Sequence, residues 1–103
     1  MNPHAVEHCD TMDDVRRHID ALDARIVPLL VERGGYVAQA ARIKPHQDQV
    51  YDQPRIDFIV ERVKSLARDL QGSEAVVEAT YRAMIDAFIA YEHGEFARLR
   101  RED

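Results

Sequence analysis

The chain has 103 residues, a hydrophobic fraction of 46% and a formal net charge of −5. These values are typical of one globular domain, and the negative charge disfavours non-specific nucleic-acid binding, which needs a basic face. No apolar run approaches the roughly 20 residues that span a membrane, and residues 1–10 lack the pattern of a signal peptide. We therefore expect a cytoplasmic protein without a nucleic-acid or membrane partner.

The first predicted helix covers residues 11–43 and follows a flexible leader, residues 1–10. Thr11 is the expected N-cap, and Pro45 ends the helix. Pro28 is expected to kink it, because proline removes a backbone hydrogen bond. The apolar residues that recur at helical spacing are Val15, Ile19, Leu22, Ile26, Leu30, Val37 and Ala40.

The leader contains His4, His8 and the single cysteine, Cys9. One cysteine excludes an internal disulfide. A flexible segment is a poor scaffold for a metal site, so no metal is expected.

Two more helices are predicted within the helical domain, residues 11–103. The second starts near Asp52 or Gln53 and is expected to stop at Gly72. The third is capped by Ser73 and runs to about Arg98. Because no segment alternates with period two over a useful length, the predicted fold is all-α, with one long and two shorter helices.

The length of the first helix predicts a homodimer. About 33 helical residues span about 50 Å, whereas a compact domain of this size has a radius of gyration of about 13 Å. The two shorter helices cannot cover so long an apolar stripe, so we expect a second copy to cover the rest.

Four charged residues interrupt the apolar stripes. At about 100° per residue, Arg33 falls roughly 20° from Ile26, and Lys44 is in line with it. Arg55 and Glu92 are placed similarly on the second and third helices. A buried charge costs several kcal/mol unless it is paired, so charges pointing inward from three helices predict a pocket for a small anionic ligand.

The segment VRRHIDALDARIVPLLVER, followed by the lysine of ARIK, resembles the all-helical chorismate mutase family, which includes the related isochorismate-pyruvate lyases. The resemblance extends from about Met12 to Arg98. It implies an intertwined homodimer with two active sites, a small dicarboxylate substrate and no cofactor. The pathway stays open between aromatic amino acid biosynthesis and a salicylate-derived product.

The resemblance also implies a role for each site residue. Arg16 looks like the arginine that each site borrows from the partner's first helix. Arg33 and Lys44 look like the cations of the long helix, and Asp52 and Arg55 open the second helix. Arginine forks suit the substrate carboxylates. The expected catalytic residues, Lys44 and Glu92, would donate hydrogen bonds to the ether oxygen of chorismate.

Glu92 can donate a hydrogen bond only while it is protonated. We therefore expect mutase activity to fall as the pH rises through neutrality, and Glu92→Gln to flatten that profile.

Ile56 departs from the family pattern. Family mutases commonly carry a glutamate there, which binds the hydroxyl of the substrate ring, and an apolar side chain cannot make that hydrogen bond. The related lyases, which release pyruvate and salicylate from isochorismate, also carry an apolar residue at this position. Mutase is the first expectation, and lyase is the alternative.

Simpler interpretations exist for each residue. Arg16 alone fits a solvated side chain, Asp52 alone fits an N-cap, and the terminal FARLRRED fits a solvated helix end. A non-catalytic helical dimer, acting as a regulatory or interaction module, therefore remains a third candidate. The joint occurrence of these residue types at the family spacing favours the enzyme.

Overall fold

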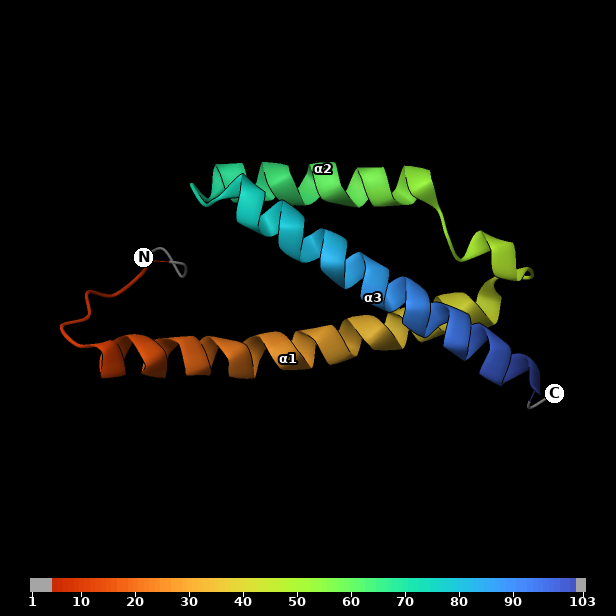
Figure 1. The fold of residues 1–103 in the computed structure, drawn as a ribbon, viewed down its shortest axis with the longest axis horizontal. Coiled ribbons are helices and arrows are strands. Elements are labelled where there is room, and N and C mark those ends of the chain that lie inside the picture. Colours follow the sequence, from red (N-terminus) through yellow and green to blue (C-terminus); the bar gives the residue numbers. More distant parts are fainter. Residues whose placement is uncertain (1–4, 102–103) are drawn as a thin grey trace. The chain divides into compact units, whose positions relative to one another are not determined.

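The computed structural model describes residues 5–101. Within this range the chain is all-helical and contains no strand, as predicted. The elements are α1 (Met12–Ile43), the short 3-10 helix η1 (Gln47–Gln49), α2 (Gln53–Asp69) and α3 (Glu74–Arg101) (Figure 1). The division into leader and domain stays a prediction, and residues 1–4 and 102–103, including His4, lie outside the described range.

The chain forms two units, one ending at Arg33 and one starting at Gly34. The first unit contains the leader and the N-terminal part of α1. The backbone N–H of Asp14 donates to the Thr11 hydroxyl at 3.1 Å, which confirms the predicted N-cap. The helix continues through Pro28 without interruption.

The first unit leaves the apolar stripe of α1 open to solvent. Ile19, Leu22, Ile26 and Leu30 are between 37% and 50% exposed. An amphipathic helix gains most of its stability from burying such a stripe. This part of α1 is therefore a surface that another apolar surface would stabilise.

The second unit contains the end of α1, η1 and the helical hairpin of α2 and α3 (Figure 1). The turn of the hairpin follows the Schellman pattern, because the N–H of Gly72 donates to the Ala67 carbonyl at 2.8 Å. The residue with positive φ is Gln71 (59°) and not a glycine. Ser73 caps α3 as predicted, accepting from the N–H of Val76 at 3.2 Å.

Small and branched apolar residues, together with one aromatic ring, form the core of the second unit. Its buried apolar side chains are Ala41, Val50, Val60, Ala67, Ile85 and Phe96. The end of α1 approaches α3 closely, since a methyl group at Gly34 would lie 3.3 Å from Cε1 of Phe88. The glycine beside Arg33 therefore marks a close helix contact.

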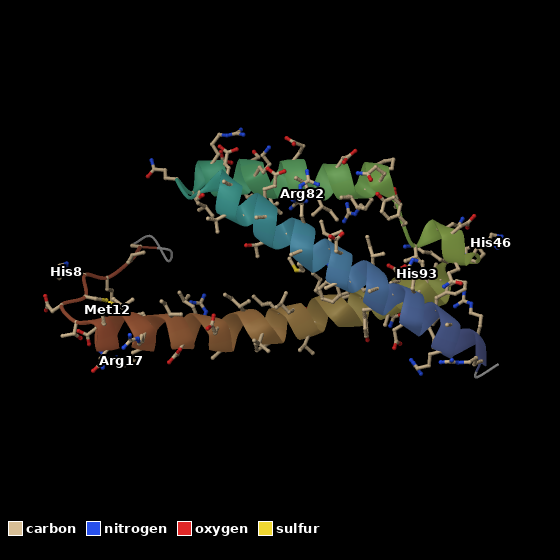
Figure 2. The ribbon with its side chains drawn as sticks, in the orientation of Figure 1. His8, Met12, Arg17, His46, Arg82 and His93 are labelled. Carbon is tan, nitrogen blue, oxygen red and sulfur yellow. The ribbon has the colours of Figure 1, made fainter. Side chains whose placement is uncertain are left out.

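The segment between α1 and α2 is held against α3. The side-chain amide of Gln47 donates to Nδ1 of His93 at 3.3 Å, where Figure 2 shows His93 at the end of the unit that carries η1. Val50, which directly follows η1 in this segment, is buried. Part of the predicted loop is thus a 3-10 turn with a fixed position.

None of the helices in the described range is both long and apolar enough to cross a lipid bilayer. The expected cytoplasmic location stays a prediction.

Candidate active site

Lys44 is the first residue after α1, directly before Pro45. Its backbone N–H still donates to the Ala40 carbonyl at 2.9 Å, so the helical geometry extends to Lys44. Its side chain is 28% exposed. The ammonium group is therefore partly withdrawn from water at the end of a long helix.

Glu92 is a buried carboxyl group on α3. It belongs to the same face as Ile85, two turns earlier, and Phe96, one turn later, and its side chain is 9% exposed. A carboxylate in such surroundings needs a charged or hydrogen-bonding partner. The inward orientation expected from the sequence is confirmed.

Lys44 and Glu92 are partners, although 48 residues separate them. Nζ of Lys44 donates to Oε2 of Glu92 at 2.7 Å, within the range of charge-assisted hydrogen bonds. Each charge offsets the desolvation of the other. The structure thus joins the two residues that were predicted to be catalytic.

The start of α2 carries three further candidates. Asp52 is the N-cap, and its Oδ1 accepts from the Arg55 N–H at 3.1 Å. Ile56 is half-buried. Arg55 is exposed, and its guanidinium carbon lies 5.2 Å from the centre of the Phe58 ring. The predicted inward orientation of Arg55 is therefore not found in the single chain, because the guanidinium covers the neighbouring aromatic ring instead.

Arg16 and Arg33 belong to the first unit. Arg16 is exposed, with Nη1 3.8 Å from Oδ1 of Asp13, one turn earlier on α1. Arg33 is half-buried on α1. The assignment of these two arginines to the pocket remains a prediction.

Sequence reasoning missed Arg100. The terminal segment was expected to be solvated, but Arg100 is half-buried and donates to the backbone at the end of α1. Local periodicity carries no signal for such a contact. The available signal was Pro45, which deprives a carbonyl of α1 of its helical donor.

For the residues that the structure describes, no group of three or more His, Cys, Asp and Glu side chains is arranged to hold a metal ion. The site is instead a pair of opposite charges at the junction of two helices. Fold and site together define an all-helical protein with an inward-facing lysine and glutamate.

The comparison with known families agrees with this class. The family model described as chorismate mutase type II matches residues 15–93. The matched range includes Lys44 and Glu92, and the chain belongs to this family. No curated protein matches the chain.

Proposed function

We propose that this protein is a chorismate mutase, which rearranges chorismate to prephenate in a cationic pocket. The observation that carries the proposal is the part-buried Lys44–Glu92 pair, at 2.7 Å, in a chain of the chorismate mutase type II family. The ammonium group of Lys44 and the carboxyl group of Glu92 are thus two hydrogen-bonding groups close to each other. An ether oxygen that gains negative charge would be stabilised by such groups.

The rearrangement breaks a C–O bond and makes a C–C bond within one molecule, so the chemistry requires no nucleophile or electron carrier. The protein has to hold the folded conformer of the substrate and stabilise the charge that develops on the ether oxygen. Lys44 donates one hydrogen bond to this oxygen. Protonated Glu92 donates another from the opposite side.

Arginines bind the two carboxylates of the substrate in this proposal. Arg33 and Arg16 each present a planar fork that matches a carboxylate with two parallel hydrogen bonds. Arg55 adds positive charge at the start of α2, beside Asp52, which fixes the first turn of that helix.

In the single chain the Lys44 ammonium is directed at Glu92. A bound dianion would compete with Glu92 for this ammonium. Protonation of Glu92 both weakens the ion pair and supplies the donor that the reaction needs. Activity is therefore expected to fall as the pH rises.

We also propose that the protein is a homodimer in which Arg16 reaches the partner's active site. The support is the stripe of Ile19, Leu22, Ile26 and Leu30, which is exposed in the single chain. A twofold-related copy would place the same stripe against its equivalent. The stripe continues along the helix that carries Arg16, so Arg16 would lie beside that interface.

One observation favours a second function, an isochorismate-pyruvate lyase. Ile56, half-buried in the first turn of α2, stands where family mutases commonly present a glutamate to the ring hydroxyl. The hydroxyl of isochorismate lies elsewhere on the ring, so an apolar residue here suits isochorismate better.

A parallel assay on chorismate and isochorismate tests both functions, with prephenate, salicylate and pyruvate quantified. Efficient prephenate formation supports the mutase. Salicylate and pyruvate, with only slow prephenate formation, identify the lyase. A protein that binds a bicyclic dicarboxylate mimic of the transition state without turnover is a regulatory relative, and one that does not bind it is an interaction module.

Replacement of Ile56 tests the basis of the choice between mutase and lyase. Ile56→Glu restores an acceptor for the ring hydroxyl, and we expect the KM for chorismate to fall about tenfold, since a hydrogen bond to a charged group contributes about 1.5–3 kcal/mol. Ile56→Leu, which adds no acceptor, is the matched control and leaves KM unchanged. Equal KM values for the two variants would show that position 56 does not contact the hydroxyl.

A further inference from the structure

Pro45 leaves a carbonyl at the end of α1 without its helical donor. In an α-helix the carbonyl of Ala41 accepts from the N–H four residues later, and at that position Pro45 has no N–H. Ala41 is also completely buried (0% exposed). An orphaned carbonyl in such a place has to be satisfied from elsewhere in the protein.

Arg100, near the end of α3, supplies the missing donor. Its Nη1 donates to the Ala41 carbonyl at 2.8 Å, and its Nη2 donates to the carbonyl of Lys44. In Figure 1 the C-terminal part of α3 crosses the end of α1. One guanidinium thus connects to two backbone positions on either side of the last turn of α1.

Three features fix this guanidinium in place. It is half-buried, its carbon atom lies 3.7 Å from the centre of the Phe96 ring, and Phe96 itself is buried. A cation over an aromatic face is stabilised further when water is excluded. The positive charge also stands at the C-terminus of α1, where the helix dipole favours it.

The contact made by Arg100 affects the position of Lys44, because Arg100 and Glu92 are on the same helix and both bind Lys44. Arg100 holds the backbone of Lys44, and Glu92 meets its side chain. Residues of α3 therefore hold both the backbone carbonyl and the ammonium group of Lys44. A planar fork can satisfy two carbonyls at once, whereas an ammonium group presents a single charged nitrogen.

We propose that Arg100 is a positioning residue that fixes the backbone of Lys44 and thereby aims its ammonium group into the active site. The proposal rests on the proposed function, in which Lys44 acts on the substrate. Arg100 itself does not touch the substrate. Small displacements of a catalytic group have large effects on rate, so the loss of this contact reduces turnover more than it reduces binding.

The lysine content of the chain allows a test that does not depend on activity. Lys44 and Lys64 are the only lysines, so protein labelled with 13C at lysine Cε gives one signal from each. Lys64, between Glu61 and Glu78, is the internal control. Arg100→Met should shift and broaden the Lys44 signal and leave the Lys64 signal in place.

Arg101→Met is the matched control, because it removes the same charge from the exposed neighbouring position. We expect this variant to move neither lysine signal. If Arg100→Met leaves the Lys44 signal unmoved, or if Arg101→Met displaces it equally, the proposal is overturned.

Steady-state kinetics complete the test at a temperature where circular dichroism shows each variant folded. We expect Arg100→Met to lower kcat about tenfold or more and to change KM much less, and Arg101→Met to match the wild-type protein. A rise in KM at unchanged kcat would make Arg100 a substrate-binding residue, and a full kcat would remove it from the reaction.

Arg100→Lys separates geometry from charge and also serves if Arg100→Met does not fold. It keeps the cation but not the fork, so its kcat should lie between those of the wild-type protein and Arg100→Met, with the Lys44 signal still displaced. Wild-type kcat with an unmoved signal would overturn the proposal. If the wild-type protein turns over neither substrate, the proposed function fails, and the Lys44 signal still decides whether Arg100 positions Lys44.

Discussion

At the scale of single residues, the Lys44–Glu92 pair combines two requirements that oppose each other. Burial of Glu92 is tolerated because Lys44 neutralises it in the single chain. The proposed reaction needs Glu92 as a donor and Lys44 free for the substrate. Protonation of Glu92 meets both needs, so the pH should control the activity through this one contact.

Glu92→Gln is expected to remove that control. The amide donates a hydrogen bond at every pH and does not hold Lys44 in an ion pair. Mutase activity of the wild-type protein should therefore fall from acid to alkaline pH, while the activity of Glu92→Gln stays nearly constant. The measurement is kcat/KM for chorismate at roughly pH 5 to 9.

Glu95→Gln is the control for this profile. Glu95 lies three residues further along α3 and pairs with Arg98, so its replacement removes the same charge without touching Lys44. The profile of Glu95→Gln should follow the wild type. A Glu92→Gln profile that still falls with pH would exclude Glu92 as the titrating donor.

Periodicity predicted the residues whose neighbours are local. Lys44 and Glu92 stand out because each interrupts an apolar stripe, and their pairing needs only that the stripes face each other. In the single chain Arg55 does not have the expected inward orientation, since about 40° from Ile59 on the helix a long side chain can still cover Phe58. Arg100 was missed because its contacts depend on how two helix ends meet.

At the scale of secondary structure, the two adjacent glycines of α1 have different surroundings. Gly34 is buried against Phe88, whereas a methyl group at Gly35 would meet no described atom within 4 Å apart from its chain neighbours and the backbone of its own helix. Glycine weakens a helix interior by about 1 kcal/mol relative to alanine. Replacing each of these two glycines in turn therefore distinguishes the effect of helix propensity on stability from the effect of packing.

Gly35→Ala should raise the free energy of unfolding by about 0.5–1 kcal/mol, because it gains helix propensity without a new contact. Gly34→Ala should gain less or lose stability, since its methyl group would lie 3.3 Å from the Phe88 ring and force it to move. Urea unfolding of both variants measures the difference. Equal gains in the free energy of unfolding would mean that the Phe88 ring moves aside without loss of stability.

The hairpin of α2 and α3 carries an ion pair across its turn. Arg68 donates from Nε and Nη2 to the two carboxylate oxygens of Glu74, at 3.1 and 2.8 Å. This hydrogen bonding, with the charge of Arg68, lowers the pKa of Glu74 below its ordinary value of 4.5. A lowered pKa in the folded state means that ionised Glu74 favours folding.

The sign of the resulting pH dependence follows from that direction. The contribution of Glu74 to stability is complete above about pH 4.5 and is lost as the pH falls through its lower folded-state pKa. Arg68→Met should therefore flatten the dependence of Tm on pH below about pH 4.5, by a small amount because the pair is solvent-exposed.

Arg62→Met provides the comparison, because it removes the same charge from an exposed position of α2. The acid limb of its Tm profile should keep the wild-type slope. Added salt should narrow the difference between the wild-type protein and Arg68→Met, as screening weakens exposed pairs. An unchanged slope in Arg68→Met would assign the acid sensitivity to other carboxylates.

The helices and their caps followed from the sequence because these signals are local. Thr11 and Ser73 bind the backbone three residues ahead, and proline after Lys44 ends α1. The turn after α2 differs from expectation, since Gln71 takes the left-handed conformation and Gly72 follows it. The chain order of these two residues does not reveal which one bears positive φ.

At the scale of the whole molecule, the exposed apolar stripe of α1 bears on the oligomeric state of the protein. A surface with Ile19, Leu22 and Ile26 each about half exposed is unusual for a monomer and typical of an interaction surface. In the dimer that we propose, a second copy covers this stripe and Arg16 reaches the partner's active site. If each active site needs residues from two chains, mixing two inactive variants should restore part of the activity.

Mixing of two inactive variants tests whether Arg16 acts across the dimer. Arg16→Ala and Lys44→Ala homodimers should each lose nearly all activity, since every site lacks one group. After unfolding and refolding together, half of the dimers are mixed, and each of these has one site with Lys44 from one chain and Arg16 from the other. Activity should therefore return to about a quarter of the wild-type value. If Arg16 serves its own chain, every site in the mixed dimer lacks one residue and the mixture stays inactive.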